Sequence, residues 1–132
     1  MRRLLLPQDY IAGLVDGEGC FSLNFRRDVR RERKKSPIYF RWKAAFSIVM
    51  RMDDHSLLEL VKTTLGCGDI TYSRGNVRFQ VQDTQILQSI IVPFFTLHKL
   101  YGKKSKDFQL WKEAVSILVK NRYTQLTPVC NF

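Results

Sequence analysis

Hydrophobic residues near the start of the chain recur at the spacing of one helical face. They lie just after Pro7, at a place where the missing backbone N–H of proline does not weaken a helix start. We therefore expect a short helix over residues 8–16. Its apolar stripe consists of Tyr10, Ile11, Leu14 and Val15.

The hydrophobic period then shortens to about 2, which is typical of strands with one apolar and one polar face. Residues 20–27 and 39–51 alternate in this way on either side of a basic loop, so they predict a long hairpin. Its apolar side would carry Phe21, Leu23, Phe25, Phe40, Trp42, Ala44, Phe46 and Ile48.

The middle of the chain predicts a helix followed by two short strands. Asp53 or Asp54 can cap the helix, and Gly66 can end it. The strands are expected at residues 69–73 and 77–82, on either side of a turn. Their apolar side would carry Ile70, Tyr72, Val77, Phe79 and Val81.

Two further helices complete the pattern. Asp83 is expected to cap a helix that runs to about Pro93, and Ser105 is expected to cap the last one. The order αββαββα plus a final helix predicts an α+β fold. The chain has no linker or low-complexity segment, so residues 1–132 are expected to form a single domain.

The chain carries a formal charge of +10, and seven cations and two acids lie between Arg26 and Lys35. A second lysine-rich segment, residues 99–106, precedes the last helix. This excess favours a polyanionic partner, with nucleic acid ahead of a membrane surface. No apolar run approaches the roughly 20 residues of a membrane span, and the apolar start is too short for a signal peptide. We expect an intracellular protein without membrane contact, in a compartment that contains DNA: the cytoplasm, a nucleoid or an organelle.

Cysteine and histidine are too few and too scattered to hold the fold together. No two cysteines have C-x-x-C spacing, and their number is odd. Both a disulfide framework and a structural zinc site are therefore disfavoured. The residues concerned are Cys20, Cys67, Cys130, His55 and His98.

The polar sides of the predicted strands are rich in side chains that hydrogen-bond base edges and phosphates. Most antiparallel sheets leave one face to solvent, so it is the scarcity of acids on this face that favours nucleic acid. The face would carry Ser22, Asn24, Arg26 and Asp28, then Arg41, Lys43, Ala45 and Ser47, then Thr71, Ser73, Arg78 and Gln80. In the basic loop, Arg30, Arg31, Arg33, Lys34 and Lys35 are expected to attract phosphates.

Residues 11–19 read Ile-Ala-Gly-Leu-Val-Asp-Gly-Glu-Gly and closely resemble the LAGLIDADG motif of homing endonucleases. The differences are conservative. Segments 46–48, 65–68 and 103–108 are also similar to this family in residue type and order. The resemblance implies an antiparallel four-stranded saddle sheet with helices on one face. It also implies an intron-encoded enzyme that cuts both strands of DNA at a specific site.

Gly13 and Gly17 lie about one helical turn apart and leave a smooth helix face. Glycine inside a helix costs about 1 kcal/mol relative to alanine, so the pair indicates close approach of a second helix. One motif forms half of a saddle, and the resemblance therefore implies a homodimer on a pseudo-palindromic site. The expected interface residues are Ile11, Ala12, Gly13, Leu14, Asp16 and Gly17.

Glu18 matches the metal-binding carboxylate of the family motif, and the main-chain carbonyl of Gly19 can add a ligand. The resemblance implies Mg²⁺, with Mn²⁺ or Ca²⁺ as substitutes, because a hard cation can be held by few carboxylates together with DNA phosphates. Such a cation neutralises the charge that develops on the phosphoryl oxygens during hydrolysis.

Lys104 best matches the family's basic residue near the scissile phosphates, and Lys103 is the competing register. A fixed positive charge there would stabilise the transition state. Met50 departs from the pattern, because the family usually has a polar residue, often Gln, at that place to position the attacking water. Methionine cannot make that hydrogen bond.

Two other kinds of function remain open. Met50 favours a protein of the same fold that does not cut DNA, either an RNA maturase that assists intron splicing or a non-cleaving DNA-binding protein. A basic ribosome-associated module would explain the charge but not the glycine-rich acidic helix.

Overall fold

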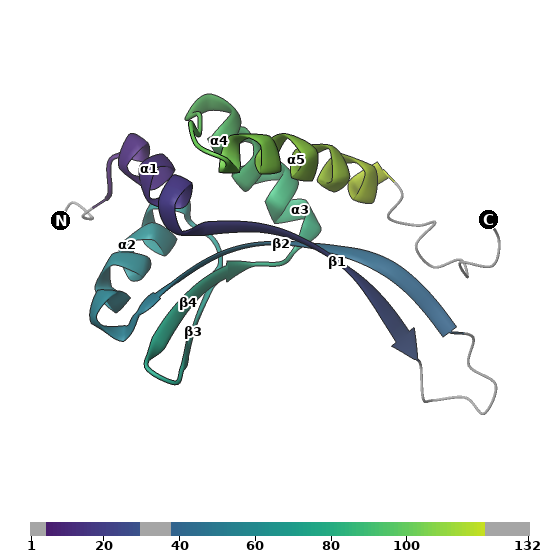
Figure 1. Ribbon diagram of the computed structural model, residues 1–132, viewed down its shortest axis with the longest axis horizontal. Coiled ribbons are helices and arrows are strands. Elements are labelled where there is room, and N and C mark those ends of the chain that lie inside the picture. The colour runs from purple at the N-terminus through teal and green to yellow at the C-terminus, as the bar shows by residue number, and fades with distance from the viewer. Residues whose placement is uncertain (1–4, 30–37, 121–132) are drawn as a thin grey trace.

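The computed structural model describes residues 5–29 and 38–120, and its four strands form one sheet in the order β1-β2-β4-β3. All neighbouring strands are antiparallel. In Figure 1 the sheet is an arch, with α1, α4 and α5 over its convex side. The predicted α+β fold is confirmed. The elements are α1 (Gln8–Glu18), β1 (Gly19–Val29), β2 (Ile38–Arg51), η1 (Met52–Asp54), α2 (His55–Leu65), β3 (Asp69–Ser73), β4 (Asn76–Val81), α3 (Thr84–Ile86), η2 (Leu87–Ile91), α4 (Val92–Leu97) and α5 (Lys104–Lys120).

Strand β2 lies at the centre of the arch. It pairs with β1 from Gly19↔Ile48 onward, and its last residues also pair with β4. Ser47 therefore stands between Cys20 on β1 and Gln80 on β4. Opposed residues of an antiparallel pair share one face of the sheet, so this register fixes which side chains lie together.

Aromatic rings fill the space between the sheet and the helices. The ring centroid of Phe21 lies 5.0 to 5.7 Å from those of Phe46, Phe95, Phe108 and Trp111. These residues come from β1, β2, α4 and α5, so one cluster joins the hairpin to both C-terminal helices. The indole N–H of Trp111 also donates to the Ser22 carbonyl at 3.0 Å, which fixes α5 on β1.

The apolar side of the sheet is only partly covered by the described helices. Phe25 and Trp42 are about half exposed, at 51% and 50%, although their rings lie 4.8 Å apart, because the hairpin reaches beyond the described helices. Tyr72 is 51% exposed on edge strand β3 and donates its hydroxyl to Glu59 at 3.3 Å. Within the described ranges, no helix is long and apolar enough to cross a membrane.

The predicted helix ends are right in part. Gly66 ends α2 with φ of 75°, and its N–H bonds to the Lys62 carbonyl. Asp83 caps α3 through hydrogen bonds from two backbone N–H groups at 2.9 and 3.3 Å. Neither Asp53 nor Asp54 caps α2 with its side chain, because the turn η1 leads directly into the helix.

Two helix predictions near the C-terminus are wrong. The helical run does not end at Pro93 but continues to Leu97. The wider turn η2 precedes this proline. There the Val92 N–H donates to the Leu87 carbonyl five residues back, whereas a regular α-helix bonds four residues back. Pro93, which has no backbone N–H to donate, follows directly. Ser105 lies inside the first turn of α5 and is not its cap.

Candidate functional site

The motif residues occupy two sides of α1. Ile11, Ala12 and Val15 are buried in the core beneath the helix. Ile11 and Ala12 therefore support the fold of their own chain and are not available to a partner, which corrects their assignment to the dimer interface. The opposite side of the helix is exposed at Gly13 and Gly17.

These two glycines have no steric role in the described part of the chain. A Cβ atom added at either position would meet nothing within 4 Å. With half-exposed Tyr10 and half-buried Leu14, they form one helical face, which we call the glycine face: Tyr10, Gly13, Leu14 and Gly17. A helix that keeps two destabilising glycines on open surface is suited to close approach by another backbone.

Gly19 has a different reason to be glycine. It is buried, and an added Cβ would lie 2.5 Å from Val15 Cγ1 and 2.9 Å from the Val15 carbonyl oxygen. Strand β1 can start without a loop after α1 because this position has no side chain. The junction fixes Glu18 as the last helical residue.

Glu18 is exposed and makes no hydrogen bond or ion pair that the described residues account for. The negative end of a helix disfavours an acid, so the helix does not stabilise this carboxylate. Its free oxygens fit a hard divalent cation. Among the described residues, no three His, Cys, Asp or Glu side chains cluster so as to hold a metal ion.

Asp16 is engaged within its own chain, unlike Glu18. Its carboxylate accepts hydrogen bonds from the backbone N–H groups of Tyr101 and Gly102, at 2.8 and 2.9 Å. Within its own chain it contacts the connection between α4 and α5, and its place at the dimer interface stays a prediction. That connection carries both candidate lysines: Lys103 is exposed, and half-buried Lys104 begins α5.

The face of the sheet opposite the helices is hollowed. Nine described side chains line a depression of about 460 Å³, and two of them are cations while none is an acid. Ala45 and Ser47 of β2 form its floor, at 6% and 7% exposure, because longer side chains of β1 and β4 flank them. We call this surface the concave face: Cys20, Ser22, Asn24, Lys43, Ala45, Ser47, Arg78, Gln80 and Gln82.

Most of the predicted polar set with described side chains meets on this face. Thr71 lies opposite Arg78 in the register, and Ser73 is exposed near the end of β3. Arg26 pairs in register with Arg41, and Asp28 with Tyr39, farther along the hairpin. The loop residues Arg30, Arg31, Arg33, Lys34 and Lys35 lie outside the described ranges.

Two residues of the concave face were not predicted to be part of the site. Cys20 lies two residues before Ser22, and Gln82 lies two residues after Gln80. The alternation of the strands extends to both positions, so period 2 alone is the signal that would have found them.

Met50 does not lie on the concave face. It is half-buried against the hydrophobic core, and it pairs with fully buried Val77. The register continues to Arg51↔Asn76. Met50 is thus an apolar residue of the helix-covered side, and it has no place among groups that could face a phosphate. This place against the core differs from the expectation that methionine there stands where the family has a water-positioning residue.

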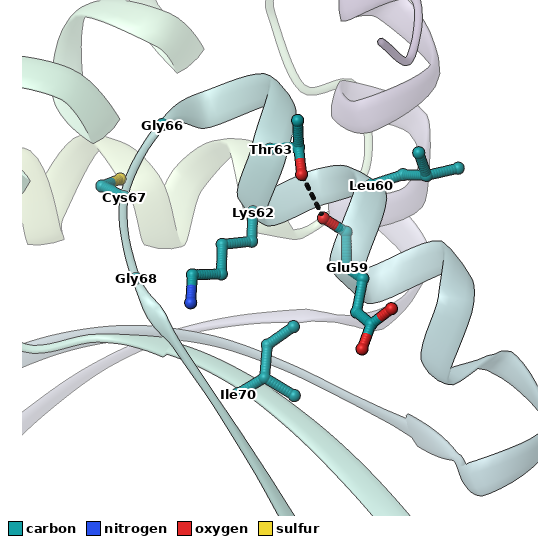
Figure 2. A pocket seen from close by; sticks show the side chains of 8 residues that line it. All are labelled: Glu59, Leu60, Lys62, Thr63, Gly66, Cys67, Gly68 and Ile70. Atoms are coloured by element: carbon teal, nitrogen blue, oxygen red, sulfur yellow. Dashed lines mark hydrogen bonds between the residues drawn. The ribbon is translucent and has the colours of Figure 1, made fainter. Parts of the chain in front are cut away.

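A second hollow lies between α2 and β3, on the helix-covered side (Figure 2). Leu60, Cys67 and Ile70 give it an apolar wall, and the Thr63 hydroxyl bonds to the Glu59 carbonyl at its rim. Burial raises the pKa of the Cys67 thiol. None of the predicted site residues lines this groove.

Together, the fold and the site define a sheet-based α+β domain with a polar concave face and an exposed carboxylate at the end of a glycine-bearing helix. A family model described as LAGLIDADG endonuclease matches residues 11–115. The chain belongs to the LAGLIDADG endonuclease family.

Individual relatives agree with this assignment. "Probable intron-encoded endonuclease 2" of Neurospora crassa is 29% identical over 124 residues, which are 92% of this chain and 26% of that protein. The crystal structure of the homing endonuclease I-TnaI has a TM-score of 0.77 at 26% identity, over 89% of this chain and 77% of that one. I-SmaMI, bound to an uncleaved DNA target in the presence of calcium ions, has a TM-score of 0.75 at 25% identity, over 96% and 42%.

The chain is short beside several of these proteins. It spans 22% to 35% of the length of curated relatives that it matches.

Proposed function

We propose that the chain is a homing-type DNA endonuclease that hydrolyses both strands of a long, pseudo-palindromic site as a homodimer with a divalent cation. The observation that carries the proposal is exposed Glu18 at the α1–β1 junction, which has no partner among the described residues and lies two residues before Cys20 of the concave face. The described residues give an acid at this place no structural role, whereas a metal-dependent nuclease needs a carboxylate that binds its cation.

The concave face would bind the DNA duplex. Lys43 supplies charge for phosphates, and Arg78, Asn24 and Gln80 supply groups that can pair with base edges. The small residues on the floor leave room for the DNA, and the strand register sets the spacing of the side chains that contact bases. Arg26 and Arg41, which pair in register farther along the hairpin, are proposed to extend this DNA-binding surface, and the basic loop is proposed to bind further phosphates.

Glu18 would hold the cation together with the Gly19 carbonyl, DNA phosphates and the matching residues of a second copy. When bound, the cation supplies an acidic water and neutralises charge on the phosphoryl oxygens. Lys103 or Lys104 would hold a positive charge near the same phosphates. We propose Mg²⁺ as the ion, because one or two carboxylates with phosphates suit its preference for oxygen ligands.

The glycine face supports a second copy as the partner. Two glycines on open helix surface allow two α1 helices to approach closely, and each helix would bring its own Glu18 to the two-fold axis. The chain covers 42% of I-SmaMI and therefore corresponds to about one half of it. A symmetric pair of halves would require a site with matching symmetry.

The name of the Neurospora relative describes it as intron-encoded, which supports the same origin for this chain. We place its activity in a compartment that contains DNA. The non-cleaving and RNA-maturase alternatives lose the feature that favoured them, because Met50 lies on the helix-covered side.

The direct test is to incubate the protein with a supercoiled plasmid library of candidate sites. A nuclease of this type will linearise plasmids that carry its site in Mg²⁺ and will leave them intact in EDTA. A protein that retains specific plasmids on a filter but never cuts them in Mg²⁺ or Mn²⁺ is a binding protein, and the proposal is then wrong. Preferential retention of intron RNA over every DNA site would favour the maturase.

A further inference from the structure

Asp16 joins two parts of the chain that lie far apart in sequence. Its Oδ2 atom accepts from the Tyr101 N–H at 2.8 Å, and its Oδ1 atom accepts from the Gly102 N–H at 2.9 Å. The Gly102 N–H also lies 3.2 Å from Oδ2, so one carboxylate engages two successive amides. These bonds span 85 and 86 residues, and they connect the end of α1 to the connection between α4 and α5.

Gly102 is adapted to this contact. A Cβ atom added there would lie 3.1 Å from Asp16 Oδ1 and 3.7 Å from its Cγ. The absence of a side chain thus lets the carboxylate approach the backbone. Apart from the chain neighbours of Gly102, Asp16 is the only described residue within 4 Å of that Cβ position, so its carboxylate is the close contact that favours glycine at this place.

Gly102 and Lys103 lie directly before helix α5, and their carbonyls accept its first hydrogen bonds. The Gly102 carbonyl accepts from the Ser105 N–H at 3.0 Å, and the Lys103 carbonyl accepts from the Lys106 N–H at 3.2 Å. A carboxylate that fixes the Gly102 amide therefore fixes the first turn of the helix. Lys103 and Lys104 leave the backbone within that same turn.

We propose that Asp16 is a positioning residue, which holds Lys103 and Lys104 in a set place relative to Glu18. Glu18 follows Asp16 by two residues on α1, so one short, helical piece of chain carries both the metal-binding carboxylate and the tie to the lysines. This inference rests on the proposed nuclease function. It assigns Asp16 no contact with the cation or the DNA.

Asp83 provides a matched control. It too accepts hydrogen bonds from two backbone N–H groups, but from Gln85 and Ile86 of its own helix start. Asp83→Asn alters the same chemistry at a place with no link to the lysines. A variant effect shared by both positions would indicate stability alone.

The tie itself can be measured by amide hydrogen exchange. Asp16→Asn keeps the shape of the side chain, but its NH₂ group must face one of the two N–H donors. We expect the amides of Tyr101 and Gly102 to lose protection in this variant. The amide of Met52, which bonds to the Gly75 carbonyl at 2.9 Å, should keep its protection.

The consequence can be measured on a site that the parent protein cuts. With DNA saturated by protein, Asp16→Asn should lower the single-turnover cleavage rate at least about tenfold, because small displacements of catalytic groups are costly. The dissociation constant for DNA should change less than about threefold, since the concave face is untouched. Gly102→Ala should act in the same direction, and Asp83→Asn should leave the cleavage rate of the folded protein unchanged.

Two results would overturn the positioning role while the nuclease proposal stands. One is a parental cleavage rate in Asp16→Asn despite reduced protection at Tyr101 and Gly102. The other is an equal loss in Asp16→Asn and Asp83→Asn. A parent protein that binds a site and cuts none overturns the proposed function itself, and the positioning role with it.

Discussion

Ser47 and Met50 lie three residues apart on β2 and on opposite faces of the sheet. Ser47 belongs to the concave face, between Cys20 and Gln80, whereas Met50 pairs with buried Val77 beneath the helices. The polar position of this strand that is closest in register to the α1–β1 junction is thus Ser47, because Gly19 pairs with the next residue, Ile48. An apolar residue at position 50 serves the core and carries no argument against catalysis.

Because Met50 lies on the helix-covered side of the sheet, its substitution should change the stability of the fold but not the cleavage rate. Met50→Leu keeps the volume and should cost less than about 1.5 kcal/mol in the free energy of unfolding. Met50→Gln should destabilise the fold more, since it places an amide against the core. Neither should raise the cleavage rate of the folded protein. A faster rate in Met50→Gln, measured at full DNA saturation, would return this residue to the active site.

Gly13→Leu should separate the two α1 helices of the proposed dimer. The added Cβ meets nothing within 4 Å in the described part of the chain, and leucine is a better helix former, so the monomer should keep its thermal stability. Sedimentation velocity should then show a monomer, and specific DNA binding should be abolished. Gln109→Leu, at an exposed position of α5, is the control. A Gly13→Leu protein that sediments as the parental dimer would rule out the glycine face as the interface.

Arg78 is expected to read DNA from the concave face. Arg78→Ala should cost about 1–3 kcal/mol of binding free energy and relax specificity at one base position, because Arg78 is proposed to bond a base edge. Lys62→Ala removes a cation from the groove on the helix-covered side and should change specific affinity little. Equal losses in the two variants would show that general charge, not the concave face, governs binding.

The loop from Arg30 to Lys35 should act differently from Arg78. Neutralising one loop cation should weaken binding to all sequences about equally. It should also lower the salt dependence of binding by roughly one unit of slope for each phosphate that the loop no longer neutralises. Titrations at several salt concentrations with specific and scrambled DNA measure both quantities. A loss confined to one base position would refute the phosphate role for the residue changed.

The native cysteines report which face the DNA covers. Cys20 is an exposed free thiol on the concave face, and Cys67 is a half-buried free thiol on the other side of the sheet. Burial raises the pKa of Cys67, so it should alkylate more slowly at neutral pH because less thiolate is present. Bound DNA should slow alkylation of Cys20 and leave the rate at Cys67 unchanged, by peptide mass spectrometry. Protection of Cys67 alone would place the DNA on the wrong face.

The alternation of polar and apolar residues predicts most of the strand faces but not their coverage. Phe46, Val77 and Phe79 are buried as expected, since helices from other parts of the chain lie over them. Phe25 and Trp42 have the same pattern and stay half exposed, because the hairpin outruns the described helices. The alternation along a strand indicates which side chains share a face of the sheet. Whether helices bury that face depends on how far each helix and strand extends in the assembled fold.

Some features of the candidate site could likewise be predicted from the sequence, and others could not. The motif marks Glu18 and the glycines, since their roles depend on positions along one helix. The role of Asp16 depends on Tyr101 and Gly102, which come beside it only after folding, and no spacing in the sequence indicates that contact. The place of Met50 against the core was not predicted, because a family pattern without the register of β2 does not say which face a residue takes.

The most direct test of the account compares Glu18→Gln with the parent on one cleavable DNA site. Glutamine keeps the size of the side chain but lacks the charge needed to hold a hard dication against its hydration shell. We predict that this variant binds the site as tightly as the parent, or more tightly because an acid near phosphate is neutralised, and that it cuts neither strand in Mg²⁺. Cleavage by Glu18→Gln at the parental rate would contradict the assignment of the metal site and the central claim with it.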